Sequence, residues 1–120
     1  MRSLKRRDLE VRAKKELEGK GYAVARAMSS ARIIGSKYVA HYNDFFNSFD
    51  LIAVKDNEVR FIQVTSGTQL SSHKKKVKEN FPYLFTKVVS VEMWYYYKLG
   101  RKWEYTISYL RNGVWMDSRL

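Results

Sequence analysis

The stretch FDLIAVKDNEVRFIQVTSG, residues 49–67, decides the fold. Two apolar runs, 51–54 and 59–64, flank the polar segment KDNE, and Asx residues between β-prone runs predict a hairpin turn. In an antiparallel hairpin the start of the first strand lies beside the end of the second. We therefore expect Asp50 to meet Gln63 and Thr65 at one end of the sheet. Because side chains alternate along a strand, Gln63 and Thr65 should share one face and Val64 should occupy the other.

Further elements are predicted on both sides of this hairpin. Residues 4–20 have helical periodicity, with Ser3 as a cap and Gly21 as the stop, and residues 70–81 form a second helix ending before Pro82. The other expected segments are a strand over 22–28, a loop over 29–32, strands over 87–97 and 102–110, and a short tail from 114. Residues 37–42 could add a short strand after a break at Gly35-Ser36. The predicted class is α/β (α+β), a mixed sheet flanked by helices in the order α-β-β-β-α-β-β.

The composition is that of one folded, basic domain spanning residues 1–120. A hydrophobic fraction of 45% with 15% aromatics excludes a disordered chain. No apolar run approaches the roughly 20 residues that cross a bilayer, and we see no secretory signal. The absence of cysteine excludes disulfides and thiolate chemistry and fits a cytoplasmic protein. A net charge of +11 indicates a polyanionic partner, nucleic acid above all, although an acidic membrane surface would also attract it.

The order of these elements resembles the PD-(D/E)XK nuclease superfamily, whose fold is restriction-endonuclease-like, and within it the archaeal Holliday-junction resolvases. That family has an acidic residue at a strand start, a hairpin, and then an acid-x-Lys pair. Asp50 matches the first acid, with a spacing to Gln63 that is normal for these resolvases. Glu10, on a basic helix that leads into GYAVAR (21–26), matches the helix Glu and the strand after it. The sequence departs from the pattern at Gln63, where the second acid belongs, and at Thr65, where the lysine belongs.

The resemblance implies a site built from Glu10, Asp50, Gln63 and Thr65. In the family, carboxylates hold Mg²⁺ or Mn²⁺, and this chain offers Glu10, Asp50 and the Gln63 amide oxygen as ligands. Gln63 carries no charge, and Thr65 cannot replace a lysine electrostatically. Lys74 or Lys37 could supply a relocated lysine. Glu10 has an alternative role as an intrahelical partner of Arg6 or Lys14.

Cationic side chains gather on the two predicted helices and beside the loop. Hydroxyls and backbone N–H groups of a small-residue loop can also bond phosphate oxygens, as the loop in this position does in the resolvases. A solvated surface is the alternative for each of these residues. The candidate nucleic-acid contacts are Arg6, Arg7, Ser29, Ser30, Arg32, Lys37, Lys74, Lys75, Lys76 and Lys78. His73 adjoins the lysine run without a metal-ligand companion at useful spacing and is a further candidate for phosphate contact.

The last two strands are rich in aromatic residues. Val89, Val91, Met93, Tyr95 and Tyr97 share one face of the first, and Trp94 and Tyr96 lie on the other. Core packing accounts for most of these, yet aromatics on both faces suggest a dimer interface or a base-stacking surface. Since the related resolvases are dimers, a homodimer interface is our first choice.

These observations predict a protein with a Holliday-junction-resolvase-like nuclease fold that binds duplex or branched DNA, with nuclease activity weak or lost. One alternative is an active Mg²⁺-dependent endodeoxyribonuclease in which a lysine has moved into the site. A second alternative is a structural or regulatory subunit that binds another protein through its aromatic sheet.

Overall fold

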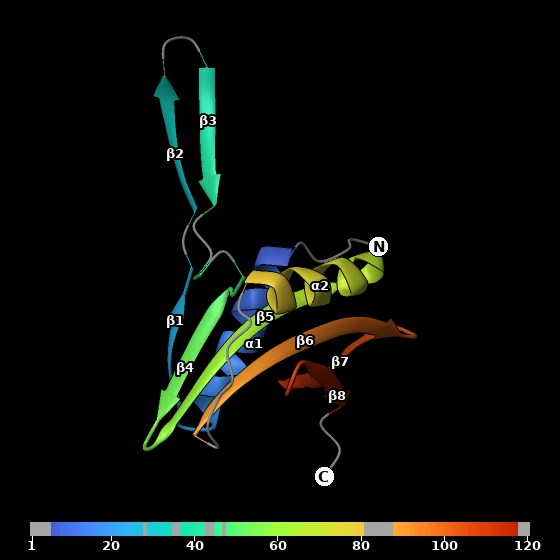
Figure 1. Cartoon of the computed structure of the whole chain (residues 1–120). Coiled ribbons are helices and arrows are strands. Elements are labelled where there is room, and N and C mark those ends of the chain that lie inside the picture. Colours follow the sequence, from blue (N-terminus) through green and yellow to red (C-terminus); the bar gives the residue numbers. More distant parts are fainter. Residues whose placement is uncertain are drawn as a thin grey trace.

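The computed structural model describes residues 6–27, 29–34, 37–42, 45–46, 48–80 and 88–117. These residues form two α-helices, one short 3₁₀ helix and eight strands (Figure 1). In order they are α1 (Arg6–Gly19), β1 (Ala23–Arg26), β2 (Ser29–Ile34), β3 (Lys37–Tyr42), β4 (Leu51–Lys55), β5 (Glu58–Ser66), η1 (Gly67–Gln69), α2 (Leu70–Asn80), β6 (Val89–Leu99), β7 (Lys102–Arg111) and β8 (Val114–Asp117). The predicted mixed α+β class is confirmed.

Six strands form the main sheet in the order β1-β4-β5-β6-β7-β8. All neighbours are antiparallel except β5 and β6, which run parallel. A parallel pair needs a crossover connection, and α2 lies within it. The β4–β5 hairpin has the predicted turn, with Lys55 paired to Glu58, and Asp56 takes a left-handed φ of 48° that Asx residues tolerate.

Two predictions about the order of elements were wrong. Residues 29–32, expected as a loop, belong to β2, which pairs with β3 as a separate two-stranded sheet. This hairpin projects away from the main sheet (Figure 1). The tail after the Asn112-Gly113 turn contains β8, which pairs with β7. Both segments are short and become strands through pairing, which the composition of an isolated segment does not reveal.

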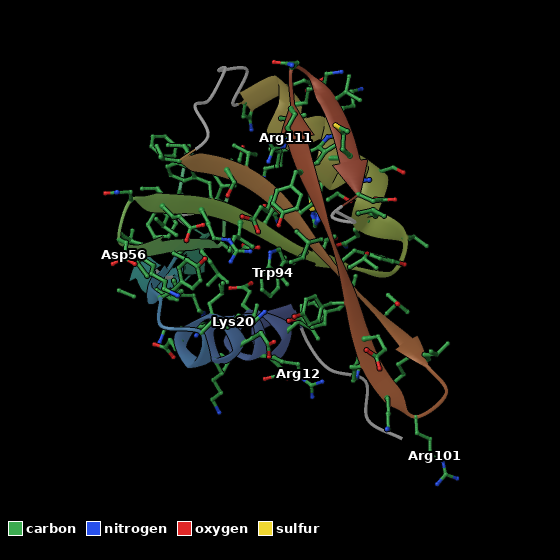
Figure 2. All side chains as sticks on the ribbon, turned by 90° about the horizontal axis from the view of Figure 1, so that it is seen from below. Arg12, Lys20, Asp56, Trp94, Arg101 and Arg111 are labelled. Carbon is green, nitrogen blue, oxygen red and sulfur yellow. The ribbon has the colours of Figure 1, made fainter. Side chains whose placement is uncertain are left out.

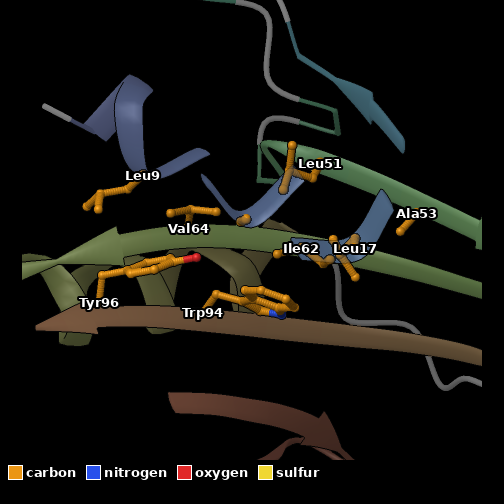
Figure 3. Close-up of a cluster of buried hydrophobic side chains, with 9 residues drawn as sticks. Leu9, Leu17, Leu51, Ala53, Ile62, Val64, Trp94 and Tyr96 are labelled. Carbon is orange, nitrogen blue, oxygen red and sulfur yellow. The ribbon is translucent and has the colours of Figure 1, made fainter. Parts of the chain in front are cut away.

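The two helices pack on opposite faces of the sheet. Leu9, Ala13 and Leu17 of α1 are fully buried against strands β4, β5 and β6. The cluster, drawn in Figure 3, also contains Leu51, Ala53, Ile62, Val64, Trp94 and Tyr96. On the other face Val77 of α2 packs with Phe49, Val91 and Met93. Within the described residues, no helix is both long and apolar enough to cross a bilayer.

The aromatic residues Trp94 and Tyr96 are core side chains. Each is only 1% exposed beneath α1, and Tyr105 of the neighbouring strand stacks on Trp94 with ring centroids 5.0 Å apart. Their face is therefore not a surplus aromatic surface, and the argument for an interface that rested on it was wrong. The aromatic residues of β6 that remain partly exposed are Tyr95 and Tyr97, on the face opposite to α1.

Candidate functional site

Asp50 and Gln63 meet at one end of the sheet, as predicted from the hairpin. The Gln63 Nε2 donates to Asp50 Oδ2 over 3.0 Å, and the Val64 backbone N–H donates to the same oxygen over 2.8 Å. The Asp50 backbone N–H continues the strand pairing by donating to the Ile62 carbonyl. Asp50 is 2% exposed and Gln63 is fully buried, so each polar contact is made away from water. A carboxylate that accepts N–H bonds is favoured in its charged form.

Two hydrogen bonds from its nitrogen orient the Gln63 side-chain amide. Besides the bond to Asp50, its Nε2 lies 3.2 Å from the Val64 carbonyl oxygen, so the nitrogen side faces two acceptors. The Gln63 Oε1 is buried and has no hydrogen-bond partner among the described residues, and the same is true of Ser48 Oγ. Unpaired buried polar atoms cost about 1–3 kcal/mol each.

Thr65 carries the second contact of the site. Gln63 and Thr65 project from the face that α2 covers, whereas Val64 belongs to the cluster under α1, which confirms the predicted alternation. The Thr65 Oγ1 and the His73 Nδ1 lie 2.6 Å apart and share a hydrogen bond. Thr65 is 1% exposed, and His73 is half-buried. An imidazole from α2 thus reaches the end of β5.

The sequence offered two clues to His73 but did not identify it as Thr65's partner. It lies eight residues after Thr65, and only the short η1 separates β5 from α2. A helix that begins directly after a strand must lie close to the end of that strand in its first turns. The direction of the helix, which decides whether His73 faces Thr65 or solvent, depends on burying Val77 against the sheet.

Glu10 lies on the other helix and pairs with Arg26 of β1. Its Oε1 is 3.4 Å from the Arg26 Nε, and both side chains are partly buried. Arg26 pairs with Leu51, and Leu51 points to the face that α1 covers. The ion pair therefore joins α1 to the edge strand on the side opposite to Gln63 and Thr65. Lys14, which was considered as a partner for Glu10, bonds Glu18 at 3.0 Å.

The three expected metal ligands do not fit a divalent ion in this arrangement. Gln63 presents an N–H, not an oxygen, to Asp50, and Glu10 pairs with Arg26. In the part of the chain that the structure describes, no group of three or more His, Asp or Glu side chains could hold a metal ion. The arrangement as it stands is a hydrogen-bonded carboxylate–amide pair beside a hydroxyl–imidazole pair.

The helix α2, which supplies His73, also carries four lysines. Lys75 and Lys78 are exposed, and Lys74 and Lys76 are partly exposed. The Lys74 ammonium lies over the Trp115 ring at 5.8 Å, and Lys75 pairs with Glu79 at 3.9 Å. The remaining predicted contacts have side chains outside the described residues: Arg6, Arg7, Ser29, Ser30, Arg32 and Lys37.

Comparison of the chain with protein-family models, with curated proteins and with solved structures finds no match.

Proposed function

We propose that this protein binds duplex or branched DNA along the end of the sheet where Asp50 and Gln63 meet, with cleavage of phosphodiester bonds weak or lost. The observation that carries the proposal is the Thr65–His73 hydrogen bond, because it fixes the lysine-rich α2 beside the Asp50–Gln63 pair. A net charge of +11 supports a polyanionic ligand. By the resemblance to the PD-(D/E)XK nucleases, DNA would approach this end of the sheet with its backbone toward the Asp50–Gln63 pair.

Weak cleavage follows from what Gln63 and Thr65 contribute. Metal-dependent hydrolysis requires oxygen ligands for the ion and positive charge near the reacting phosphate. Gln63 offers Asp50 an N–H in place of a second oxygen ligand, and Thr65 offers a hydroxyl in place of an ammonium group. Loss of one such stabilising group costs about 10²–10³ in rate.

DNA binding is tested by its dependence on salt. The logarithm of the binding constant should fall with the logarithm of salt concentration at about −0.9 per phosphate contact. Lys75→Gln should reduce this slope by about one contact. Lys20→Gln is a matched control, because Lys20 is also an exposed lysine in an i,i+4 pair but lies just after the C-terminal end of α1. A slope near zero for the unmodified protein would contradict DNA binding.

Cleavage is tested with a labelled four-way junction and Mn²⁺. We expect little or no nicking by the unmodified protein. Nicking that is fast and is lost in Asp50→Ala would contradict the proposal of weak cleavage and leave DNA binding intact. Gln63→Glu combined with Thr65→Lys should restore cutting if the site is otherwise positioned for catalysis.

A second candidate function, metal-dependent DNA cleavage, is favoured by one specific observation. His73 places an imidazole next to Thr65, where the resemblance puts the lysine. An imidazole contributes positive charge when it is protonated, as the lysine of the family pattern does. The relocated group would then be His73, while Lys74 lies over Trp115.

The alternative of a subunit that binds another protein through its aromatic sheet is narrowed to one face. Trp94 and Tyr96 are buried under α1, which leaves Tyr95 and Tyr97 on the opposite face for such a partner.

A further inference from the structure

The hairpin of β6 and β7 extends past the strand beside it. β5 ends at Ser66, which pairs with Tyr96, whereas β6 continues to Leu99 and returns as β7 from Lys102. The residues from 97 to 104 therefore pair only with each other. Figure 2 shows Arg101 at the far end of this hairpin, away from the body of the sheet. We call residues 95–106 the β6–β7 tip.

One face of the β6–β7 tip continues directly from the candidate site. Tyr95 pairs in register with Thr65, so the two side chains lie side by side on the face that is opposite to α1. Tyr97 follows two residues later on the same face, and the two rings stack with centroids 5.9 Å apart and an interplanar angle of 24°. Both tyrosines are partly exposed, and Leu99 beyond them is 67% exposed. An aromatic track thus leads from Thr65 to the end of the hairpin.

Positive charge gathers at the far end of this aromatic track. Lys102 pairs in register with Leu99 on the same face, whereas Glu104 pairs with Tyr97, and Lys98 points to the opposite face. The β6–β7 tip contains Lys98, Arg101 and Lys102 against a single acid, Glu104. Arg101, Lys102 and Lys98 are exposed, and Lys98 also lies over the Trp103 ring at 5.6 Å. Aromatic rings among cations form the combination that binds single-stranded nucleic acid, because rings stack on bases while cations hold phosphates.

The charge of the β6–β7 tip favours a nucleic acid over a second copy of this chain as its binding partner. A two-fold dimer would bring the same patch of both subunits together. The net positive charge of the β6–β7 tip would then face itself, which costs free energy in an interface. A polyanion with accessible bases complements the same surface.

We propose that Tyr95 and Tyr97 form a stacking surface for unpaired bases of branched or partly single-stranded DNA, and that Arg101 and Lys102 hold its phosphates. The inference rests on the proposed function and names its substrate class. In a continuous duplex each base already stacks on its neighbours, so only bases at a branch, flap or end can reach the tyrosines. Preference for such structures would come from this stacking, and affinity for any DNA would come from the lysines of α2.

The test compares two DNAs of equal length and charge, a flap with unpaired bases and a continuous duplex. Tyr97→Ala should weaken binding of the flap by about 5-fold to about 150-fold, as expected for the loss of one stacked base, and change duplex binding less than about 2-fold. Tyr97→Phe is the matched control, since it retains the ring and should bind both DNAs as the unmodified protein does. Quenching of 2-aminopurine placed in the flap reports the stacking directly.

Three results would overturn the proposal. If Tyr97→Ala weakens binding of the flap and the duplex equally, or weakens neither, base stacking at Tyr97 is excluded. The proposed function would survive this result, because the unmodified protein would still bind DNA. Failure of the unmodified protein to bind either DNA would remove the proposed function and this inference together. A dimer in sedimentation that Tyr97→Ala converts to a monomer would identify the tyrosines as an interface between copies.

Discussion

Arg60 of β5 and Glu92 of β6 form a two-pronged ion pair in the core of the sheet. The guanidinium Nε and one Nη each lie 2.7 Å from a different oxygen of the Glu92 carboxylate. Glu92 also accepts bonds from Ser90 Oγ and Trp94 Nε1, and its side chain is fully buried. Burial by itself lowers the pKa of Arg60, but the hydrogen bonds and charge of Glu92 outweigh this and raise the pKa above its ordinary value. The two residues are 32 positions apart in sequence, and their ion pair joins the parallel strands β5 and β6.

Removing one partner of this pair should strongly destabilise the protein. Arg60→Ala leaves the Glu92 carboxylate buried without its cation, and we expect the free energy of unfolding to fall by about 3–5 kcal/mol in urea titrations. Arg111→Ala serves as a control, because Arg111 is exposed over the Tyr109 ring and should cost less than about 1 kcal/mol. A loss below 1 kcal/mol for Arg60→Ala would contradict the importance of the pair.

Tyr96 should make stability fall at alkaline pH. Burial, together with the Tyr105 beside it, raises the pKa of Tyr96 above its ordinary value of 10.0. Because the folded-state pKa is the higher one, the stabilisation is complete below pH 10 and is lost as pH rises through the folded pKa.

Tyr96→Phe isolates this effect. The Tyr96 hydroxyl has no hydrogen-bond partner among the described residues, so its removal should be neutral or stabilising at pH 7. Above pH 10 the variant should be more stable than the unmodified protein by a margin that grows with pH. Parallel unfolding curves of the two proteins at all pH values would show that Tyr96 does not contribute.

Gln63→Glu should create a metal-dependent stability. The substitution puts two buried carboxylates where Nε2 and Oδ2 now lie 3.0 Å apart, and repulsion should cost about 1–3 kcal/mol in EDTA. Adjacent oxygens on Mg²⁺ are about 2.9 Å apart, so a divalent ion fits between them. We expect Mn²⁺ to raise the melting temperature of this variant. Gln63→Met, which cannot bind the ion, is the control, and the absence of any Mn²⁺ effect on Gln63→Glu would show that the ion does not enter.

His73→Ala separates the two candidate functions. If the protein cleaves DNA through the imidazole beside Thr65, this variant should lose about 10²–10³ in Mn²⁺-dependent nicking rate, measured with the DNA saturated by protein so that a change in affinity does not affect the rate. In the proposed function, nicking is weak in both proteins. Undiminished fast nicking by His73→Ala would exclude the imidazole from catalysis.

The sequence of a single segment was enough to predict the β4–β5 hairpin and the two helices. The β4–β5 hairpin follows from β-prone runs around an Asx turn, and a short hairpin brings Asp50 to Gln63 as a matter of strand geometry. Helix bounds followed from periodicity and from Gly21 and Pro82. The mixed sheet was expected from the resemblance of the order of elements to a known fold, and the structure has one parallel pair, β5 and β6, among antiparallel neighbours.

Other features depended on contacts between distant segments. The β2 and β8 strands form only by pairing with β3 and β7, and the burial of Trp94 and Tyr96 is decided by which face of the sheet α1 covers. Alternation along β6 reveals two faces but not which one a helix will occupy. The Thr65–His73 bond likewise depends on how α2 lies on the sheet. Sequence alone therefore determined which polar groups share one end of the hairpin, and tertiary packing decided which of them are buried, which helix reaches them and which tyrosines stay exposed.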